Sequence, residues 1–346
     1  MLKSVSKLNI NRLVTATTTT LCSISTSYNI NRYSSSTTTT SSSNNNTTLF
    51  TNNTSTTTTK YFNNNNTKYT PTSRSYSSKK KEATSIDSPK TLTLSTYFKF
   101  PEFGVHEWAN LNRGTAFIVK TPKQFFVEPN RSVYIISCGH ITHPFNFPHL
   151  YKDETHQWIF ALGEQNIKAQ LEYRDASTGK VTHIVPIDKP FHLHPTEDLV
   201  CIEANLDDFK RSNLPFTPSV LELEVYEEPR KGHTGKLFGY QLVNEKDDIM
   251  EPVTMDFIYN TGDANRHFVS TKSPAPMGVC GGPVINFDNE VVGMIEGLVK
   301  LNVNDIDKQD ETQRRFLHGI NSNAVFLPSK IINNFIKEVD IHINDN

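Results

Sequence analysis

Beyond about residue 93, apolar residues gather in short runs separated by polar, turn-forming residues. Most runs are five to ten residues long and rich in β-branched and aromatic side chains, which is typical of β-strands. Breaks such as Glu-Pro-Asn at 128–130 and Phe-Asp-Asn at 287–289 favour turns. So many short strands with little helix between them predict an all-β barrel or sandwich rather than a parallel α/β sheet. The predicted strands cover residues 115–120, 132–138, 157–163, 168–174, 182–187, 198–204, 236–243, 257–261, 283–287, 290–299 and 323–327.

One segment has the periodicity of a helix. Residues 328–339 begin with Pro328 and Ser329, which favour a helix start, and their apolar side chains recur at helical spacing. The sequence therefore predicts a helix near the C-terminal end. Its apolar stripe consists of Ile331, Ile332, Phe335, Ile336 and Val339.

The first 90 residues differ sharply in composition from the rest. Residues 1 to 81 hold ten Lys or Arg side chains and no Asp, Glu or His, amid long Ser, Thr and Asn tracts. A basic, acid-free start of this kind is typical of a mitochondrial transit peptide, which we assign to residues 1–34, with a cytoplasmic location as the alternative. Residues 35–90 have too few apolar side chains to offset the entropy of ordering, and are predicted to be a disordered linker. The folded domain is expected at residues 91–346.

Charge and hydropathy argue against two classes of partner. Beyond residue 81, 25 basic residues face 36 acidic ones, a net charge of −11, which disfavours a nucleic-acid-binding surface. No unbroken apolar run is long enough to predict a secretory signal or a membrane span.

The cysteines are spaced too irregularly for a disulfide framework, which fits a reducing compartment. They are Cys22, Cys138, Cys201 and Cys280.

Cys280 lies in a glycine-rich segment that favours reactive-cysteine chemistry. Gly278, Gly281 and Gly282 permit tight turns with positive φ, which can direct several backbone N–H groups to one point, and Pro283 stiffens the exit. A thiol becomes a good nucleophile when a neighbouring base removes its proton. The candidate site therefore also needs a histidine and an acid from elsewhere in the chain.

Two residues meet that need. His140 follows the apolar run at 132–138, and Asp198 opens the run at 198–204, so each is expected at the end of a strand. The chain order is His, Asp, Cys. Alone, each residue has an ordinary structural interpretation as a turn residue, a hydrogen-bonding histidine or a small buried thiol.

The sequence motifs around these residues resemble those of the trypsin-like peptidases. These motifs are RGTAFIV, ISCGH, EDLVCIEA and GVCGGPV. The later segment AVFLPSKIINNFI is similar to the last strand and helix of the high-temperature-requirement (HtrA) proteases. With cysteine in the nucleophile position, the last loop also resembles that of the viral 3C-like cysteine proteases. The resemblance spans roughly residues 113 to 339. It implies two six-stranded antiparallel β-barrels of the chymotrypsin type with a C-terminal helix.

The resemblance also implies residue roles. His140 would be the general base, Asp198 would orient it, and Cys280 would attack the carbonyl of a polypeptide substrate without a cofactor. Backbone N–H groups of Gly278 and Cys280 would form the oxyanion hole. The substrate-binding edge would consist of Ile295, Glu296 and Gly297. The chain is thus expected to be a cysteine endopeptidase.

Three positions depart from the patterns of these families. Val279 stands where trypsin-type enzymes keep the aspartate that pairs with a newly formed N-terminus, so activation by that ion pair is not expected. Ile295 replaces the histidine that selects glutamine in 3C-like enzymes, and Pro274 replaces the acidic pocket residue of trypsin. Neither glutamine nor a basic residue is therefore predicted as the preferred substrate residue.

Two other functions compete with catalysis. Cys138, His140 and His143 form a C-x-H-x-x-H cluster that Cys280 might complete as a zinc site, although the spacing is tighter than in common zinc modules. Alternatively, the exchange of serine for cysteine could mark an inactive pseudoprotease. Such a protein would bind peptides by adding them as a strand to an exposed sheet edge.

Overall fold

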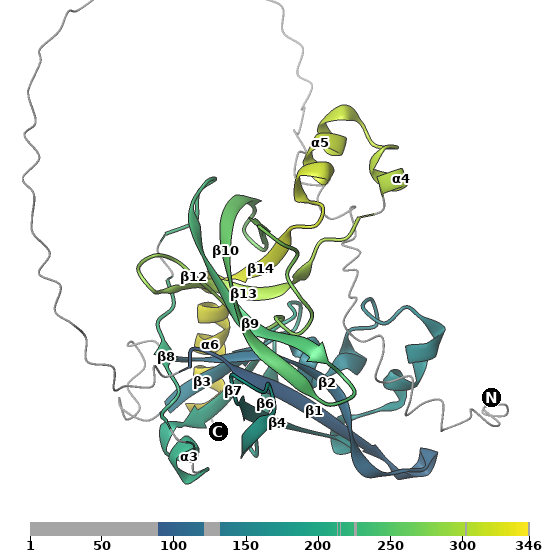
Figure 1. The fold of residues 1–346 in the computed structure, drawn as a ribbon, viewed down its shortest axis with the longest axis vertical. Helices are drawn as coiled ribbons and strands as arrows, with labels where there is room; N and C mark the ends of the chain where they lie inside the picture. Colours follow the sequence, from purple (N-terminus) through teal and green to yellow (C-terminus); the bar gives the residue numbers. More distant parts are fainter. Residues whose placement is uncertain are drawn as a thin grey trace, which may run out of the picture. The chain divides into compact units, whose positions relative to one another are not determined.

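A computed structural model describes residues 89–120, 132–212, 214, 216–224, 227–301 and 303–344 of the chain (Figure 1). The predicted transit peptide at 1–34 lies outside these residues, as does the linker at 35–90 apart from its last two positions. Both stay predictions, and so does the mitochondrial location. None of the described helices is long and apolar enough to cross a membrane.

The described chain is mostly β. Its strands are β1 Leu92–Phe100, β2 Val105–Lys120, β3 Ser132–Ser137, β4 Ile167–Arg174, β5 Val181–Pro186, β6 Phe191–Leu193, β7 Val200–Asn205, β8 Val220–Leu221, β9 Thr234–Asn244, β10 Ile249–Gly262, β11 His267–Thr271, β12 Pro283–Ile285, β13 Val291–Leu298 and β14 Ala324–Pro328. Its helices are η2 Pro101–Phe103, α2 Gly139–Thr142, η3 Pro144–Asn146, η4 Glu154–Ala161, η5 Glu164–Asn166, α3 Leu206–Arg211, α4 Val303–Ile306, α5 Glu311–Ile320 and α6 Ser329–Asn344.

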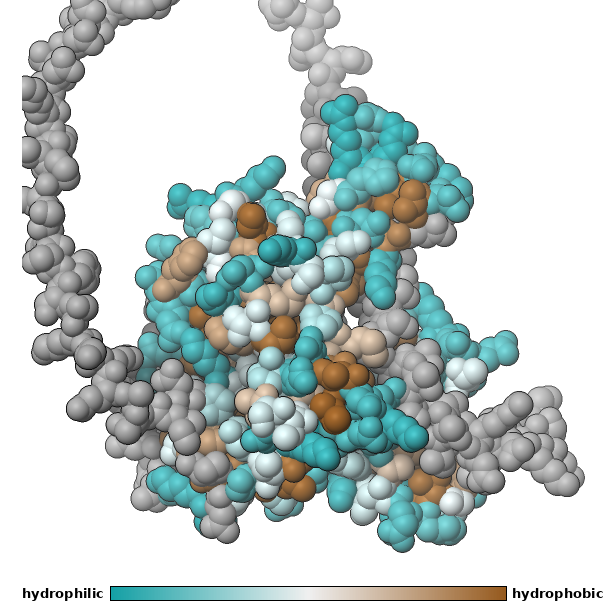
Figure 2. All heavy atoms as spheres, in the orientation of Figure 1, coloured by the Kyte–Doolittle hydropathy of each residue, from teal (hydrophilic) through white to brown (hydrophobic). Residues whose placement is uncertain are grey.

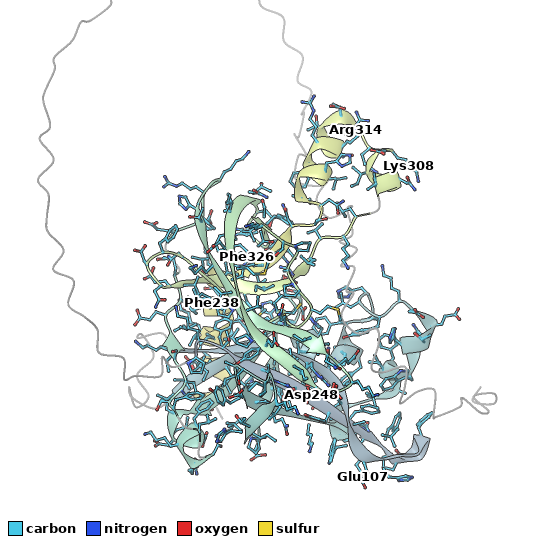
Figure 3. The ribbon with its side chains drawn as sticks, in the orientation of Figure 1. Glu107, Phe238, Asp248, Lys308, Arg314 and Phe326 are labelled. Carbon is cyan, nitrogen blue, oxygen red and sulfur yellow. The ribbon has the colours of Figure 1, made fainter. Side chains whose placement is uncertain are left out.

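The second half of the domain is a closed barrel of six strands in the order β10-β11-β14-β13-β12-β9. All its pairings are antiparallel, as predicted for this half. Figure 3 labels Phe326 among these strands, and its side chain is 1% exposed within the barrel core. Other members of that core are Leu237, Phe257, Val269, Val284 and Ile295.

The first half does not form the second closed barrel that the resemblance implies. Its strands form one open sheet in the order β5-β4-β1-β2-β3-β7-β6, with β8 pairing in parallel with β2. The two edge strands, β5 and β6, do not pair with each other. Pro186 ends β5 and Pro190 precedes the three-residue β6, and neither proline can donate a backbone hydrogen bond to extend a ladder.

A cavity of about 340 Å³ lies among β4, β5, β7 and α3, and its lining includes the apolar Leu171 and Val185 and the charged Asp188.

The strand predicted at 157–163 is wrong. Residues 154–161 form the 3-10 helix η4, because Trp158 and Leu162 pack on Phe98 and Leu111 instead of entering a ladder.

One apolar cluster joins both halves. It contains strand residues of the open sheet, residues of the barrel such as Ile285 and Met294, and the predicted stripe of α6. The helix predicted at 328–339 is therefore confirmed, and its stripe packs against the junction of the two halves (Figure 1). Hydrophilic side chains cover most of the face in Figure 2, with smaller apolar patches between them.

Candidate active site

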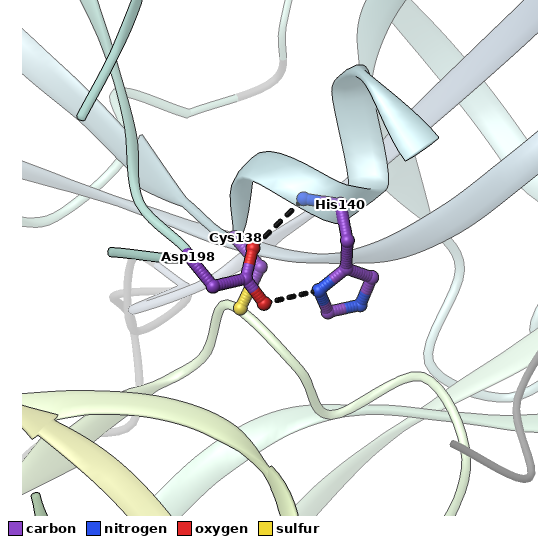
Figure 4. Close-up of side chains that lie close together, drawn as sticks. All are labelled: Cys138, His140 and Asp198. Atoms are coloured by element: carbon purple, nitrogen blue, oxygen red, sulfur yellow. Dashed lines mark hydrogen bonds and ion pairs between the residues drawn. The ribbon is translucent and has the colours of Figure 1, made fainter. Parts of the chain in front are cut away.

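His140 and Asp198 form a buried pair at the end of β3. Asp198 Oδ1 accepts a hydrogen bond from the His140 backbone N–H at 2.8 Å, and Asp198 Oδ2 lies 2.5 Å from His140 Nδ1 (Figure 4). The two residues are 1% and 8% exposed. Opposite an ionised carboxylate, Nδ1 carries the ring proton, so Nε2 is the nitrogen that can act as a base.

Strand pairing brings these two residues together. β3 and β7 are antiparallel neighbours, with Ser137 opposite Val200. Cys138 continues β3 with extended backbone and begins the short helix α2, which carries His140. Asp198 stands two residues before Val200 on the partner strand. The predicted placement of both residues at strand ends is what allows them to meet.

Cys138 is a third member of this cluster. Its Sγ, a ring nitrogen of His140 and a carboxylate oxygen of Asp198 all lie within 4.8 Å of one another (Figure 4). The thiol is 0% exposed and donates a hydrogen bond to the Ile295 carbonyl at 3.3 Å. Burial, reinforced by the charge of Asp198, raises the pKa of Cys138 well above its ordinary value. Cys138 is therefore a protonated, structural thiol at neutral pH.

The Cys280 loop packs directly on the segment that carries His140. The Cys280 carbonyl accepts a hydrogen bond from Thr115 N–H at 2.8 Å, and Gly281 N–H donates to the Ile295 carbonyl at 2.8 Å. A Cβ on Gly281 would lie 2.4 Å from Ser137 Oγ and 3.2 Å from Cys138 N, which places the loop against the end of β3. Cys280 is 8% exposed and forms no disulfide.

His140 Nε2 is buried and has no hydrogen-bond partner within the described chain. The structure therefore does not join this nitrogen to the Cys280 thiol by a hydrogen bond. In substrate-free structures of enzymes generally, contacts between a nucleophile and its base are often long and tighten only in the complex with substrate.

Gly278, a predicted oxyanion-hole donor, has a left-handed backbone conformation. Its φ of +95° is favoured only for glycine. Leu242 N–H donates to the Met277 carbonyl at 2.8 Å, and in a trans peptide the Gly278 N–H points the opposite way. That N–H makes no hydrogen bond to any described residue, whereas the Gly278 carbonyl accepts from Thr115 Oγ1 at 2.8 Å.

Val279 anchors the Cys280 loop by apolar packing. The residue is 4% exposed and packs in the barrel core with Phe257 and Tyr259. A Cβ on Gly239 would lie 3.2 Å from Val279 Cβ, so β9 also approaches this side chain closely. The loop is therefore held at Val279 by packing in the barrel core.

The three residues predicted at the substrate-binding edge lie on β13. Ile295 is 1% exposed, and its backbone carbonyl and N–H bond to Gly281 and Gly282, so it anchors the Cys280 loop. Glu296 is 6% exposed and faces inward. Gly297 pairs with Val325 of β14. The side chains of Ile295 and Glu296 are thus both buried in this structure, and a substrate role for this edge stays a prediction.

Glu296 belongs to a buried ionic cluster beside Asp198. Arg266 Nε lies 2.5 Å from Glu296 Oε2, and Arg266 Nη2 lies 2.6 Å from Glu197 Oε2. Burial raises the pKa of Glu296 to about 7, an effect that Arg266 opposes and the charges of Asp198 and Glu197 reinforce. Arg266 carries no recognisable sequence signal, because it follows a turn far from the motifs. Glu197, adjacent to Asp198, could have been suspected.

The predicted zinc set is not assembled. The His143 ring packs edge-on against Phe145 and Phe191, and its Nδ1 lies 2.9 Å from Thr142 Oγ1. Among the residues that the structure describes, the group able to hold a metal ion is Cys138, His140 and Asp198. In that group the histidine and the carboxylate are already bonded to each other, as an acid–base pair requires.

No protein-family model matches the chain, and no curated protein matches it either. The assignment of the site therefore rests on its own residues and geometry.

Glu296 provides a pH-dependent test of this geometry. A carboxyl whose pKa is raised by folding favours the folded state at low pH, and this contribution is lost as the pH rises through about 7. The free energy of unfolding of the parent should therefore fall between about pH 4.5 and 7, and fall less in Glu296→Gln. Urea titrations at several pH values measure this, with the exposed Glu102→Gln as the control. Parallel pH profiles for parent and Glu296→Gln would contradict the assigned environment.

Proposed function

We propose that the chain is a cysteine endopeptidase of trypsin-like fold, with Cys280, His140 and Asp198 as its catalytic triad. The observation that carries the proposal is the double contact of Asp198 with His140 at the rim where the Cys280 loop packs. A histidine so oriented has the tautomer and position of a general base. The Ser-to-Cys exchange is compatible with this, because the loop around Cys280 keeps its positive-φ glycines.

The reaction follows from these positions. His140 Nε2 accepts the Cys280 proton, the thiolate attacks the substrate carbonyl, and the developing oxyanion accepts hydrogen bonds from Gly278 and Cys280 N–H. The imidazolium, stabilised by Asp198, then protonates the leaving amine and an acyl-thioester remains. Water, deprotonated by His140, hydrolyses the thioester and regenerates the thiol.

Cys280 suits the nucleophile role better than Cys138. Cys138 is fully buried, hydrogen-bonded to Ile295, and has a pKa raised by burial. Cys280 follows the exposed Met277 in a loop whose Gly278 N–H makes no bond within the described chain. Only a thiol beside such a donor can form an acyl-enzyme with a stabilised oxyanion.

A peptide digest tests the proposal. The purified chain is incubated with a diverse peptide mixture, and new termini are identified by mass spectrometry. We expect cleavage by the parent and by Cys201→Ala, and none by Cys280→Ala. Retained cleavage in Cys280→Ala would contradict the triad. Peptide binding without cleavage in the parent would instead support the pseudoprotease.

A further inference from the structure

The turn between β9 and β10 is fastened to the first sheet by ionic contacts. Asp248, which has a φ of +53°, is the last residue of this turn, and Figure 3 labels it where the hairpin meets that sheet. Its Oδ1 lies 2.7 Å from Arg113 Nη1 and 2.9 Å from Arg174 Nη2. Its backbone carbonyl also accepts a hydrogen bond from Arg174 Nη1 at 2.5 Å.

The partner arginine Arg174 is itself rigidly held. It is 1% exposed, its Nη2 donates to Glu172 Oε2 at 2.6 Å, and its Nε donates to Thr93 Oγ1 at 3.1 Å. Glu172 in turn accepts from Ser95 and Tyr97 of β1, both at 2.8 Å. A buried ionic group is tolerated when it is fully paired in this way. The network therefore gives Asp248 a fixed anchor in the first sheet.

The strand residues next to this turn contact the loop that carries Gly278 and Cys280. Leu242 N–H of β9 holds the Met277 carbonyl, and Thr115 Oγ1 bridges Tyr240 N–H, at 2.9 Å, to the Gly278 carbonyl. A Cβ on Gly278 would lie 2.7 Å from Met250 Cε and 2.8 Å from the Tyr240 carbonyl. Both strands of the hairpin thus touch the peptide whose N–H is offered to the substrate.

We propose that Asp248 is a positioning residue for the oxyanion hole. By pairing with Arg113 and Arg174 it holds the β9–β10 hairpin where Leu242, Tyr240 and Met250 fix the Met277–Gly278 peptide. Together with the packing of Val279, this ionic anchor keeps the loop competent without a newly formed N-terminus. The inference rests on the proposed function, because it assigns a support to that same site.

Two reagents separate this role from a general effect on the thiol. A peptidyl p-nitrophenyl ester acylates Cys280 through a tetrahedral intermediate, which needs the oxyanion donors. Iodoacetamide alkylates the same thiol by displacement at a saturated carbon, which needs no oxyanion hole. Asp248→Asn is the variant of choice, because asparagine tolerates positive φ and keeps one acceptor oxygen while the charge is lost.

In Asp248→Asn we expect the ester to acylate Cys280 at least about tenfold more slowly than in the parent. Iodoacetamide should alkylate Cys280 in this variant at the parent rate. Arg113→Gln, which removes one cation from Asp248, should show the same split. The matched control is Asp256→Asn on β10, whose carboxylate pairs with Lys236 at the exposed surface. Melting temperatures establish that each variant is folded.

Unchanged acylation in both variants would overturn the inference, and so would an equal fall in acylation and alkylation. Those outcomes leave the triad standing, because the parent thiol still reacts. A Cys280 thiol that reacts with neither reagent in the parent chain would overturn the proposed function, and the inference with it.

Discussion

Asp198→Asn is expected to lower peptide turnover by about 10³-fold or more at neutral pH. An amide in place of the carboxylate can donate to His140 Nδ1, which moves the ring proton to Nε2. The Nε2 atom then cannot accept the Cys280 proton. The side-chain contact at 2.5 Å and the backbone contact at 2.8 Å show how directly Asp198 controls this ring. Steady-state kinetics on a cleaved peptide measure the effect.

The matched control is Asp188→Asn, which changes an exposed aspartate between β5 and β6. Its turnover should equal that of the parent. Turnover by Asp198→Asn within about fivefold of the parent would show that His140 does not depend on Asp198, contrary to the tautomer argument.

Gly281→Ala is expected to destabilise the fold by about 3 to 5 kcal/mol. Gly281 has a φ of +84°, where a Cβ alone costs about 1 to 2 kcal/mol. The new methyl group would also lie 2.1 Å from the Thr115 carbonyl and 2.4 Å from Ser137 Oγ. The loop would have to leave the end of β3, so both stability and Cys280 reactivity should fall. Chemical denaturation measures the first effect.

Gly232→Ala separates the two causes. Gly232 has a φ of +88°, but a Cβ there meets nothing within 4 Å. Gly232→Ala should therefore lower the free energy of unfolding only by the cost of a Cβ at positive φ, about 1 to 2 kcal/mol. Equal losses in the two variants would mean that the contact of Gly281 with β3 does not constrain the loop.

Local sequence patterns predicted the elements whose buried faces are apolar. The C-terminal helix could be predicted because its apolar stripe repeats at helical spacing. Most barrel strands could be predicted because they are rich in β-branched side chains. β1 was missed, because the residues that it buries include Thr93 and Ser95, which serve the Glu172–Arg174 network. The apolar run at 157–163 predicts a strand but begins within the 3-10 helix η4, because a short apolar run carries no periodicity that separates a strand from a helical turn.

The pairing of strands that are distant in the chain was harder to predict from the sequence. The resemblance implies that the first half also closes into a barrel. Closure would require β5 to pair with β6, and this pairing depends on the short length of β6 and on Pro186 and Pro190, which the hydrophobic pattern of the strands does not reveal. Within the site, His140 and Asp198 were predicted and lie in contact. Arg266 and Asp248 were not predicted, because each acts through partners distant in the chain.

The most direct test of the central claim is the alkylation rate of each cysteine in the folded chain. Iodoacetamide is added between pH 5 and 9 to the parent and to His140→Ala, and each site is quantified by mass spectrometry. We expect Cys280 to react first, and His140→Ala to slow its reaction by about tenfold or more near pH 6. Cys138 and Cys201, both fully buried with raised pKa values, should react only after unfolding. A Cys280 rate that is unchanged in His140→Ala would contradict the account.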